Sequence, residues 1–211
     1  MDTTFALFAI LGALLLGAIS PGPSFVLVAR TAIARSRQDG LATALGMGVG
    51  GAVFGSLALL GLIALLSQVA WLYAVLKVLG GLYLLYLAFM LWRGAKQEID
   101  VRDGNQTRSA RPERSFALAL VTQLSNPKTA IVYSSIFAAL LPKAPPLWMV
   151  AILPGLILLV EAGWYAVVAL AFSSERPRRA YLRSKRWIDR AAGSVMGALG
   201  LKLMLEAGRP A

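Results

Sequence analysis

The chain has 211 residues, of which 58% are hydrophobic and only 15% are charged, and it contains neither cysteine nor histidine. This composition is typical of a polytopic membrane protein and argues against a water-soluble domain. Because cysteine and histidine are absent, disulfides, thiol chemistry and the usual transition-metal ligands are excluded, and we expect neither a metal nor a cofactor.

Six apolar segments follow one another along the chain, and each has the roughly 20 residues or more that a membrane-spanning helix needs. They cover approximately residues 3–29, 41–66, 69–92, 116–141, 147–172 and 187–206. The first begins like a signal peptide, but it lacks a basic flank and continues directly into a proline-containing motif, so we interpret it as a retained span. We therefore predict an all-α membrane protein, with six transmembrane helices in a single membrane domain over residues 1–211.

Polar motifs interrupt the first and the fourth of these segments. The sequence SPGP occupies residues 20–23, and SNPK occupies residues 125–128. Each motif places a capping residue, Ser20 or Asn126, directly before a proline, which is how a helix begins. Polar backbone at membrane depth is tolerated only where it is buried in protein or lines a cavity. We predict that helices 1 and 4 are broken at these prolines.

Basic residues gather in alternate connections between the apolar segments. Residues 30–40 carry three, residues 93–115 carry six and residues 174–190 carry seven, whereas the opposite side carries two. This positive-inside bias predicts that both termini are extracytoplasmic and that the basic connections contact anionic lipids. Despite the net charge of +11, we do not expect nucleic-acid binding, because no groove-reading element accompanies the charge.

With this topology, the two halves of the chain cross the membrane in opposite directions. Helix 1 enters from outside and helix 4, which carries the second break, enters from the cytoplasm. Gly81 and Ala88 in the third segment have the same spacing as Gly193 and Gly200 in the sixth, whereas the second and fifth segments show no convincing match. We predict two inverted three-helix repeats, about residues 1–92 and 116–211, joined by a cytoplasmic loop over residues 93–115.

The two breaks are predicted to lie at one depth. Counted from the cytoplasmic ends, Pro21 and Pro127 are about 14 and 16 Å deep, near the middle of a hydrocarbon core of about 30 Å. Two helix N-termini then meet there, and each presents free N–H groups and the positive end of a dipole. With the charge of Lys128, they suit a substrate carboxylate. Two packing kinks are the alternative.

Glu161 is expected near the same level, fourteen residues from Leu147 and eleven from Phe172. An ionisable group at this depth is costly and usually functional, although a structural pair with a buried lysine is the alternative. We expect Glu161 to bind the substrate ammonium group or to carry the coupling proton.

Together these arguments give a set of candidate substrate-binding residues around the two breaks. They are Ser20, Pro21, Gly22, Pro23, Ser24, Asn126, Pro127, Lys128, Thr129 and Glu161. Backbone N–H groups of Gly22, Ser24, Lys128 and Thr129 are expected to face the carboxylate. The carbonyls of Gly17, Ile19 and Gln123, freed upstream of the prolines, are expected to take the ammonium group.

The two proline motifs, the glycine-rich residues 44–51 and Glu161 with the following Trp164-Tyr165 closely resemble the LysE/RhtB family of bacterial amino-acid exporters, in particular its RhtB-like homoserine, threonine and leucine efflux branch. The resemblance covers nearly the whole chain. It implies an inner-membrane exporter of amino acids or close derivatives, driven by the proton gradient. Many members carry an aspartate or another polar residue where this chain has Gly51, which argues against a basic substrate.

The residues and the resemblance together predict a secondary-active exporter of neutral, zwitterionic amino acids by proton antiport, and not an enzyme. An exporter of inorganic cations is one alternative, but a single acid offers few oxygen ligands for a divalent ion. An intramembrane enzyme is another, and it would need a nucleophile with a base, or paired acids with a metal. The sequence leaves homo-oligomerisation open.

Overall fold

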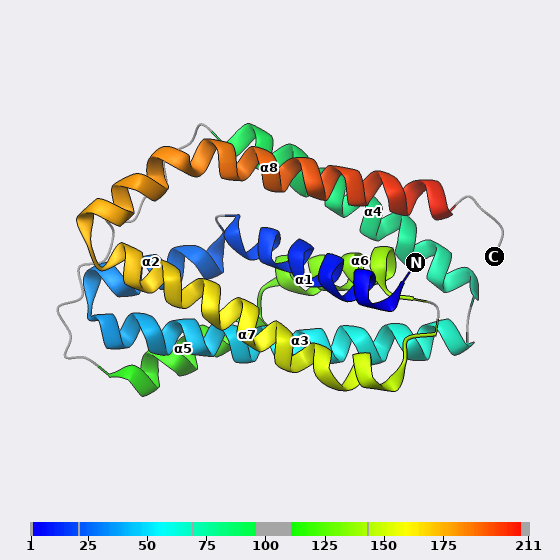
Figure 1. The fold of residues 1–211 in the computed structure, drawn as a ribbon, viewed down its shortest axis with the longest axis horizontal. Helices are drawn as coiled ribbons and strands as arrows, with labels where there is room; N and C mark the ends of the chain where they lie inside the picture. The colour runs from blue at the N-terminus through cyan, green and yellow to red at the C-terminus, as the bar shows by residue number, and fades with distance from the viewer. Residues whose placement is uncertain (1, 21, 69, 96–110, 143, 208–211) are drawn as a thin grey trace.

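The computed structural model describes residues 2–20, 22–68, 70–95, 111–142 and 144–207, and all regular structure in these ranges is helical (Figure 1). The predicted all-α class is therefore confirmed. Eight α-helices cover the described residues. They are α1 (Thr3–Ile19), α2 (Pro23–Ala34), α3 (Arg37–Gln68), α4 (Ala70–Gly94), α5 (Pro112–Leu124), α6 (Pro127–Leu140), α7 (Leu147–Phe172) and α8 (Glu175–Ala207).

Length and apolar composition allow two of the described helices, α3 over Arg37–Ala64 and α7, to cross a membrane. The pair α1 and α2, bent by 57°, forms a third candidate. Large apolar side chains are exposed on the outer faces of the helices, as expected for surfaces that contact lipid, and Leu57, Phe89 and Leu205 are examples. The count of six spans stays a prediction. Most of the loop over residues 93–115 lies outside the described residues.

The first break differs from the prediction. Ser20 is the C-cap of α1, where its N–H donates to the Leu16 carbonyl at 3.2 Å. Gly22, in an extended conformation, is the N-cap of α2, and Pro23 is the first helical residue. The prediction that Ser20 caps the restarted helix is therefore wrong. The second proline of the motif begins the helix, since proline at the first helical position sacrifices no hydrogen bond. Pro21 lies outside the described residues.

The second break follows the prediction. Asn126 is the N-cap of α6, and its side-chain oxygen accepts the N–H of Lys128 at 3.0 Å. Pro127 is the first helical residue, and its side chain is exposed. A side-chain acceptor at this position satisfies one of the N–H groups that a helix start leaves without a partner.

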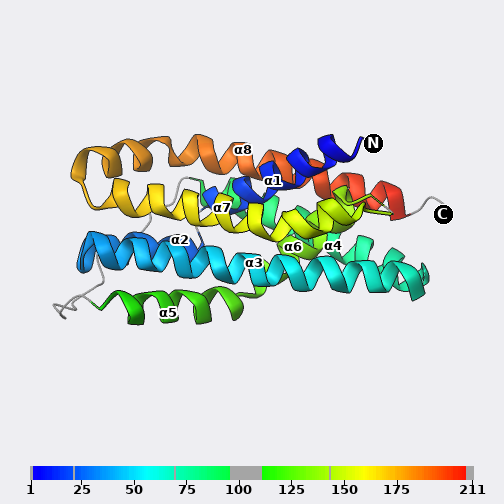
Figure 2. The same ribbon diagram turned by 60° about the horizontal axis from the view of Figure 1, so that its bottom comes forward.

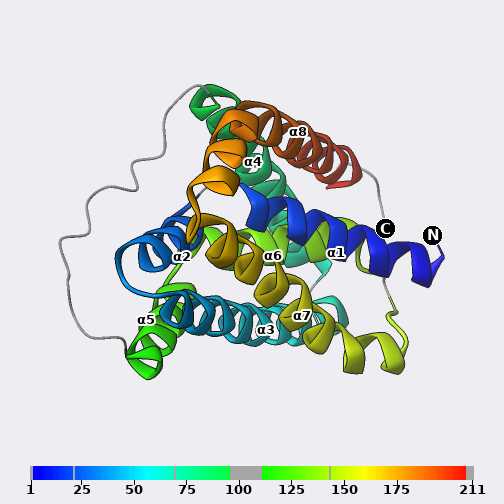
Figure 3. The same ribbon diagram turned by 60° about the vertical axis from the view of Figure 1, so that its left-hand side comes forward.

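The helices lie along the long axis of the molecule in two lengthwise pairs. α3 packs along α7, and α4 packs along α8. Figure 2 shows α8, α7, α3 and α5 side by side in that order. The broken helices α1 and α6 lie between the two pairs (Figures 1 and 3). The breaks are therefore enclosed by protein, as polar backbone inside a membrane requires.

Close backbone contact holds α4 against α8. A Cβ added at Gly81 would lie 2.9 Å from the Gly200 carbonyl oxygen, and one added at Gly200 would lie 2.8 Å from the Gly81 carbonyl oxygen. Two turns away, a Cβ added at Gly193 would lie 3.1 Å from the Ala88 carbonyl oxygen. The residues whose matching spacing was noted in the sequence thus face each other in an antiparallel helix pair. Small residues allow this close approach.

Two buried apolar clusters occupy the interior. One gathers residues of α1, α3, α4, α6, α7 and α8, including Leu14 and Tyr133. The other gathers residues of α2, α3, α5 and α7, including Phe25 and Tyr165. The two breaks lie where these clusters meet, so that the polar groups at the breaks have apolar packing on both sides.

Candidate functional site

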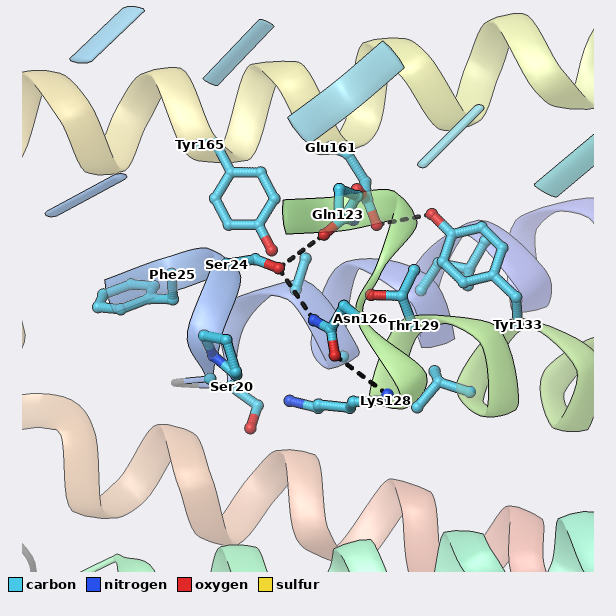
Figure 4. A pocket seen from close by; sticks show the side chains of 16 residues that line it. Ser20, Ser24, Phe25, Gln123, Asn126, Lys128, Thr129, Tyr133, Glu161 and Tyr165 are labelled. Atoms are coloured by element: carbon cyan, nitrogen blue, oxygen red, sulfur yellow. Dashed lines mark hydrogen bonds between the residues drawn. The ribbon is translucent and has the colours of Figure 1, made fainter. Parts of the chain in front are cut away.

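A cavity lies between the two breaks, lined by α1, α2, α5, α6 and α7 (Figure 4). Eight of the predicted site residues line it. They are Ser20, Gly22, Pro23, Ser24, Asn126, Lys128, Thr129 and Glu161. Pro127 starts α6 but is not one of the lining residues, and Pro21 lies outside the described residues. The structure therefore brings together side chains that are up to about 140 positions apart in the chain.

A chain of hydrogen bonds crosses this site from helix to helix. The Gln123 amide donates to Glu161 Oε2 at 2.9 Å. The Ser24 hydroxyl donates to Gln123 Oε1 at 2.6 Å and accepts from the Asn126 amide at 3.2 Å. Asn126 then caps α6 through the Lys128 N–H (Figure 4). Four elements, α7, α5, α2 and α6, are thus joined through side chains alone.

Glu161 has only 3% of its surface exposed, yet its carboxylate is bound by neutral donors. Besides Gln123, the Tyr133 hydroxyl donates to Oε1 at 2.6 Å. In the part of the chain that the structure describes, Glu161 forms no ion pair within 4 Å, which speaks against the structural lysine pair considered as the alternative. A buried carboxylate with two donors is stable in place but keeps its charge available to a cationic group.

Lys128 extends away from Glu161, toward Ser20 and the start of α2 (Figure 4). A Cβ added at Gly22 would lie 3.2 Å from Lys128 Nζ, so the ammonium group rests against the N-cap of α2. Lys128 itself is the second residue of α6. A full charge and the positive ends of two helix dipoles therefore converge on one wall of the cavity, and an anion is favoured there.

More of the backbone N–H and carbonyl groups at the breaks have hydrogen-bond partners within the protein than we predicted. The two N–H groups of α6 that were expected to face the substrate both donate to Asn126. The Lys128 N–H donates to the Asn126 side chain, and the Thr129 N–H donates to the Asn126 carbonyl at 3.1 Å. The Ile19 carbonyl accepts the Tyr181 hydroxyl at 3.2 Å, and the Gln123 carbonyl accepts the Asn126 N–H at 3.2 Å. Each of these carbonyls already has one donor and keeps a second lone pair, so their expected role in binding an ammonium group stays a prediction.

Several site residues escaped the sequence analysis. The side chains of Gln123 and Tyr133 are direct partners of Glu161, and the Tyr165 hydroxyl points toward Ser24 (Figure 4). Gln123 and Tyr133 are polar residues inside an apolar segment, within two turns of the break, and this was the only available signal. Tyr165 was noted as part of the family resemblance, but no argument placed it in the cavity.

Gly51 of α3 lies against the same carboxylate. A Cβ added there would overlap Glu161 Oε2 and would come within 2.9 Å of the Tyr133 hydroxyl oxygen. Because glycine has no Cβ, there is room for the hydrogen bond between Tyr133 and Glu161. Any longer side chain at this position would enter the polar centre of the site.

Two broken helices that meet at a buried, charged cavity inside an apolar helix bundle define a membrane transport protein. Comparison with known families agrees with this class. The model of the LysE type translocator family matches residues 15–207, and the chain belongs to this family of membrane amino-acid efflux transporters. The predicted resemblance is confirmed.

Individual relatives extend over most of the chain. It is 35% identical over 192 residues to the threonine efflux protein of Escherichia coli (strain K12), covering 89% of this chain and 92% of the relative. It is 35% identical over 143 residues to the leucine efflux protein of Klebsiella pneumoniae, covering 63% and 65%. It is also 31% identical over 206 residues to a membrane protein of Escherichia coli (strain K12) named YahN, covering 98% and 92%. No solved structure matches the chain.

Proposed function

We propose that this protein exports zwitterionic amino acids with uncharged side chains across the bacterial inner membrane, in exchange for protons. The names of the threonine and leucine efflux relatives support this substrate class. The observation that carries the proposal is that one cavity is lined by the ammonium group of Lys128 and the carboxylate of Glu161. A zwitterion presents the complementary pair of charges.

In the proposed complex, the substrate carboxylate binds Lys128 and the free N–H groups at the start of α2. The substrate ammonium group binds Glu161, which its neutral donors leave with a full negative charge. The remaining lining residues are apolar or carry uncharged hydroxyl or amide groups, for example Leu14, Thr129 and Gln123. They offer no second carboxylate to a basic side chain, which favours a neutral substrate.

Binding also requires the helices to move. The cavity encloses about 30 Å³, which is space for about two water molecules rather than an amino acid. The hydrogen-bond chain through Ser24 and Asn126 holds α2 against α6 across this space. We propose that the substrate's charged groups replace some of these bonds and that the breaks act as hinges.

Proton exchange is assigned to Glu161. When ionised, it holds the ammonium group. When a proton neutralises it, the attraction is lost and the substrate is released. Alternation between these forms, with access from one side and then from the other, exchanges one substrate for protons.

The proposed membrane arrangement is six spans in two inverted repeats with both termini extracytoplasmic. The antiparallel pairing of Gly81 with Gly200 supports a pseudo-twofold relation between α4 and α8. Basic residues at the end of the bundle where α3, α5 and α8 begin (left in Figure 1) support a cytoplasmic location for that end.

Counterflow in proteoliposomes tests the function. Vesicles loaded with unlabelled threonine or leucine are expected to take up the same labelled amino acid transiently, whereas lysine-loaded vesicles are not. An imposed pH gradient is expected to drive accumulation. A folded, reconstituted protein that exchanges only lysine, only inorganic cations or no zwitterionic amino acid would refute the proposal.

A further inference from the structure

The hydrogen-bond chain of the site has a direction, and its two ends fix that direction. At one end the backbone N–H of Lys128, which can only donate, is bound by Asn126 Oδ1 at 3.0 Å. At the other end the ionised carboxylate of Glu161, which can only accept, is bound by the Gln123 amide at 2.9 Å. Every link between these two ends must therefore donate its hydrogen toward Glu161.

Ser24 is the link that holds this direction. Its hydroxyl accepts the Asn126 amide N–H at 3.2 Å, because the Asn126 side-chain oxygen is already turned toward α6. The hydroxyl has a single hydrogen, which it donates to Gln123 Oε1 at 2.6 Å. Gln123 is thereby held with its NH2 group toward Glu161 Oε2. A donor in this position prevents Oε2 from carrying a proton unless the amide turns round.

The other carboxylate oxygen of Glu161, Oε1, has a different kind of partner. The Tyr133 hydroxyl donates to Oε1 at 2.6 Å, and a hydroxyl can rotate and accept a hydrogen bond instead. When a proton from solution binds Oε1, the new O–H donates to the Tyr133 oxygen, and no covalent bond of Tyr133 changes. The Tyr133 hydrogen then turns into the cavity, which this residue lines and which has space for about two water molecules. Protonation of Oε1 thus needs one hydroxyl rotation, whereas protonation of Oε2 needs an amide to turn round.

The other groups around the carboxylate do not change this comparison. The titratable or charged side chains that line the cavity with Glu161, among the described residues, are Lys128, Tyr133 and Tyr165. Lys128 extends away from the carboxylate, and the Tyr165 hydroxyl points toward Ser24 (Figure 4). Within the described ranges, α1, α2 and α5 contribute only uncharged lining residues, α4 and α8 contribute none, and α3 places Gly51 against the carboxylate.

We propose that the coupling proton binds Glu161 at Oε1, the oxygen that faces Tyr133, and that Ser24 is a positioning residue that enforces this choice through Gln123. The proposal rests on the function proposed above, in which Glu161 carries the proton. Because Gln123 donates to Oε2 in both protonation states, it stabilises the charged carboxylate more than the neutral acid. Ser24 therefore keeps Glu161 ionised, and able to hold a substrate ammonium group, down to a lower pH than an unrestrained Gln123 would allow.

Ser24→Ala tests this role, because it removes the donor to Gln123 and leaves both hydrogen bonds of Glu161 in place. The Gln123 carbonyl can then turn toward Glu161 and accept a hydrogen from Oε2, which favours the neutral acid. We expect the midpoint of the Glu161 titration to rise by about half to one pH unit, the size of one hydrogen bond. Infrared difference spectroscopy of the substrate-free protein measures this midpoint from the carboxyl band that Glu161→Gln lacks. Ser56→Ala is the matched control, because that hydroxyl donates at 2.8 Å to the Ala52 carbonyl of its own helix, and it should leave the midpoint unchanged.

The same substitution in the Gln123→Met background decides whether Ser24 acts through Gln123. Methionine has a similar length but no amide, so Ser24→Ala should not move the midpoint there. An equal shift with and without Gln123, or no shift in Ser24→Ala alone, would overturn the proposal. If Ser24→Ala does not insert, Ser24→Cys supports the same comparison, because a thiol is a weak donor. Gradient-driven accumulation by Glu161→Gln is a different result, and it would refute the assignment of the proton to Glu161 and this proposal with it.

Discussion

In the proposed complex, carboxylate recognition depends on Lys128, because the other positive features of the site are helix termini with partial charges. We expect Lys128→Ala to weaken substrate binding by ten- to over a hundredfold, since one charge-assisted contact contributes about 1.5–3 kcal/mol. Equilibrium binding of labelled substrate to purified protein measures this. Lys202→Met is the matched control, because Lys202 is a lysine of α8 that donates to the Ala139 carbonyl at 2.9 Å, away from the cavity. Similar losses in both variants would make Lys128 structural.

Glu161 allows coupling to be separated from binding. Glu161→Gln keeps the shape and an acceptor for Tyr133 but cannot release a proton. We expect this variant to exchange substrate only at raised substrate concentrations, because its amide lacks the charge that attracts the ammonium group, and to lose accumulation driven by an imposed pH gradient. Tyr133→Phe is the control, because it removes one donor to Glu161 and leaves the carboxyl group. It should still accumulate substrate. If Glu161→Gln concentrates substrate as well as the unmodified protein, the coupling proton is carried elsewhere.

Gly51 tests whether the close approach of α3 to Glu161 is required. Gly51→Ala places a methyl group against the carboxylate and against the Tyr133 hydroxyl. Overpacking of this kind costs about 1–3 kcal/mol, so we expect a lower thermal unfolding temperature in detergent and impaired export. Gly61→Ala on the same helix has nothing within 4 Å of the added Cβ. It should be neutral or slightly stabilising, because alanine favours helix. Equal stability of the two variants would contradict the contact.

At the scale of helices, the pairing of α4 with α8 depends on glycine at the crossing. A Cβ at Gly200 would lie 2.8 Å from the Gly81 carbonyl oxygen, whereas a Cβ at Gly197, one turn earlier, would lie 3.5 Å from the Ala88 side chain. We expect Gly200→Ala to lower stability by about 1–3 kcal/mol and Gly197→Ala to be tolerated. Thermal unfolding monitored by circular dichroism compares them. A tolerated Gly200→Ala would mean that the two backbones have room to separate.

The helices themselves were easier to predict than their first and last residues. Asn126 could be recognised as a cap because only one proline follows it. The first motif contains two prolines, and either could begin a helix. Capping preference favours serine over glycine, which pointed to Ser20. The structure begins α2 at Pro23 instead. The local capping preference therefore did not decide which proline begins α2.

The site was predictable in its location but not in its connections. Charge, proline and depth pointed to Lys128, Asn126 and Glu161, and these residues do line one cavity. The bonds that link them pass through Gln123 and Ser24, whose side chains meet across 99 positions of sequence. No local pattern encodes such a contact.

For the whole molecule, orientation is the prediction with the widest consequences, because the inverted repeat depends on it. The chain has no cysteine, so single cysteines can be introduced without background labelling. We expect Asp100→Cys to be protected from an impermeant thiol reagent in intact cells and to react after the membrane is permeabilised. Lys143→Cys, in the opposite connection, should react in intact cells and serves as the control. Labelling of position 100 from outside would reverse the topology.

The end of α1 has a consequence for how the protein is assembled. Its last carbonyls receive their hydrogen bonds from distant helices, with Trp164 of α7 donating to Ala18 at 3.1 Å and Tyr181 of α8 donating to Ile19 at 3.2 Å. These donors are synthesised roughly 150 residues after the groups they satisfy. Helix α1 thus leaves the ribosome before these donors and inserts with polar atoms that have no partner in lipid. The end of α1 becomes fully hydrogen-bonded only when α7 and α8 arrive, so a chain that stops before α7 should be recognised as unfinished by the machinery that degrades immature membrane proteins.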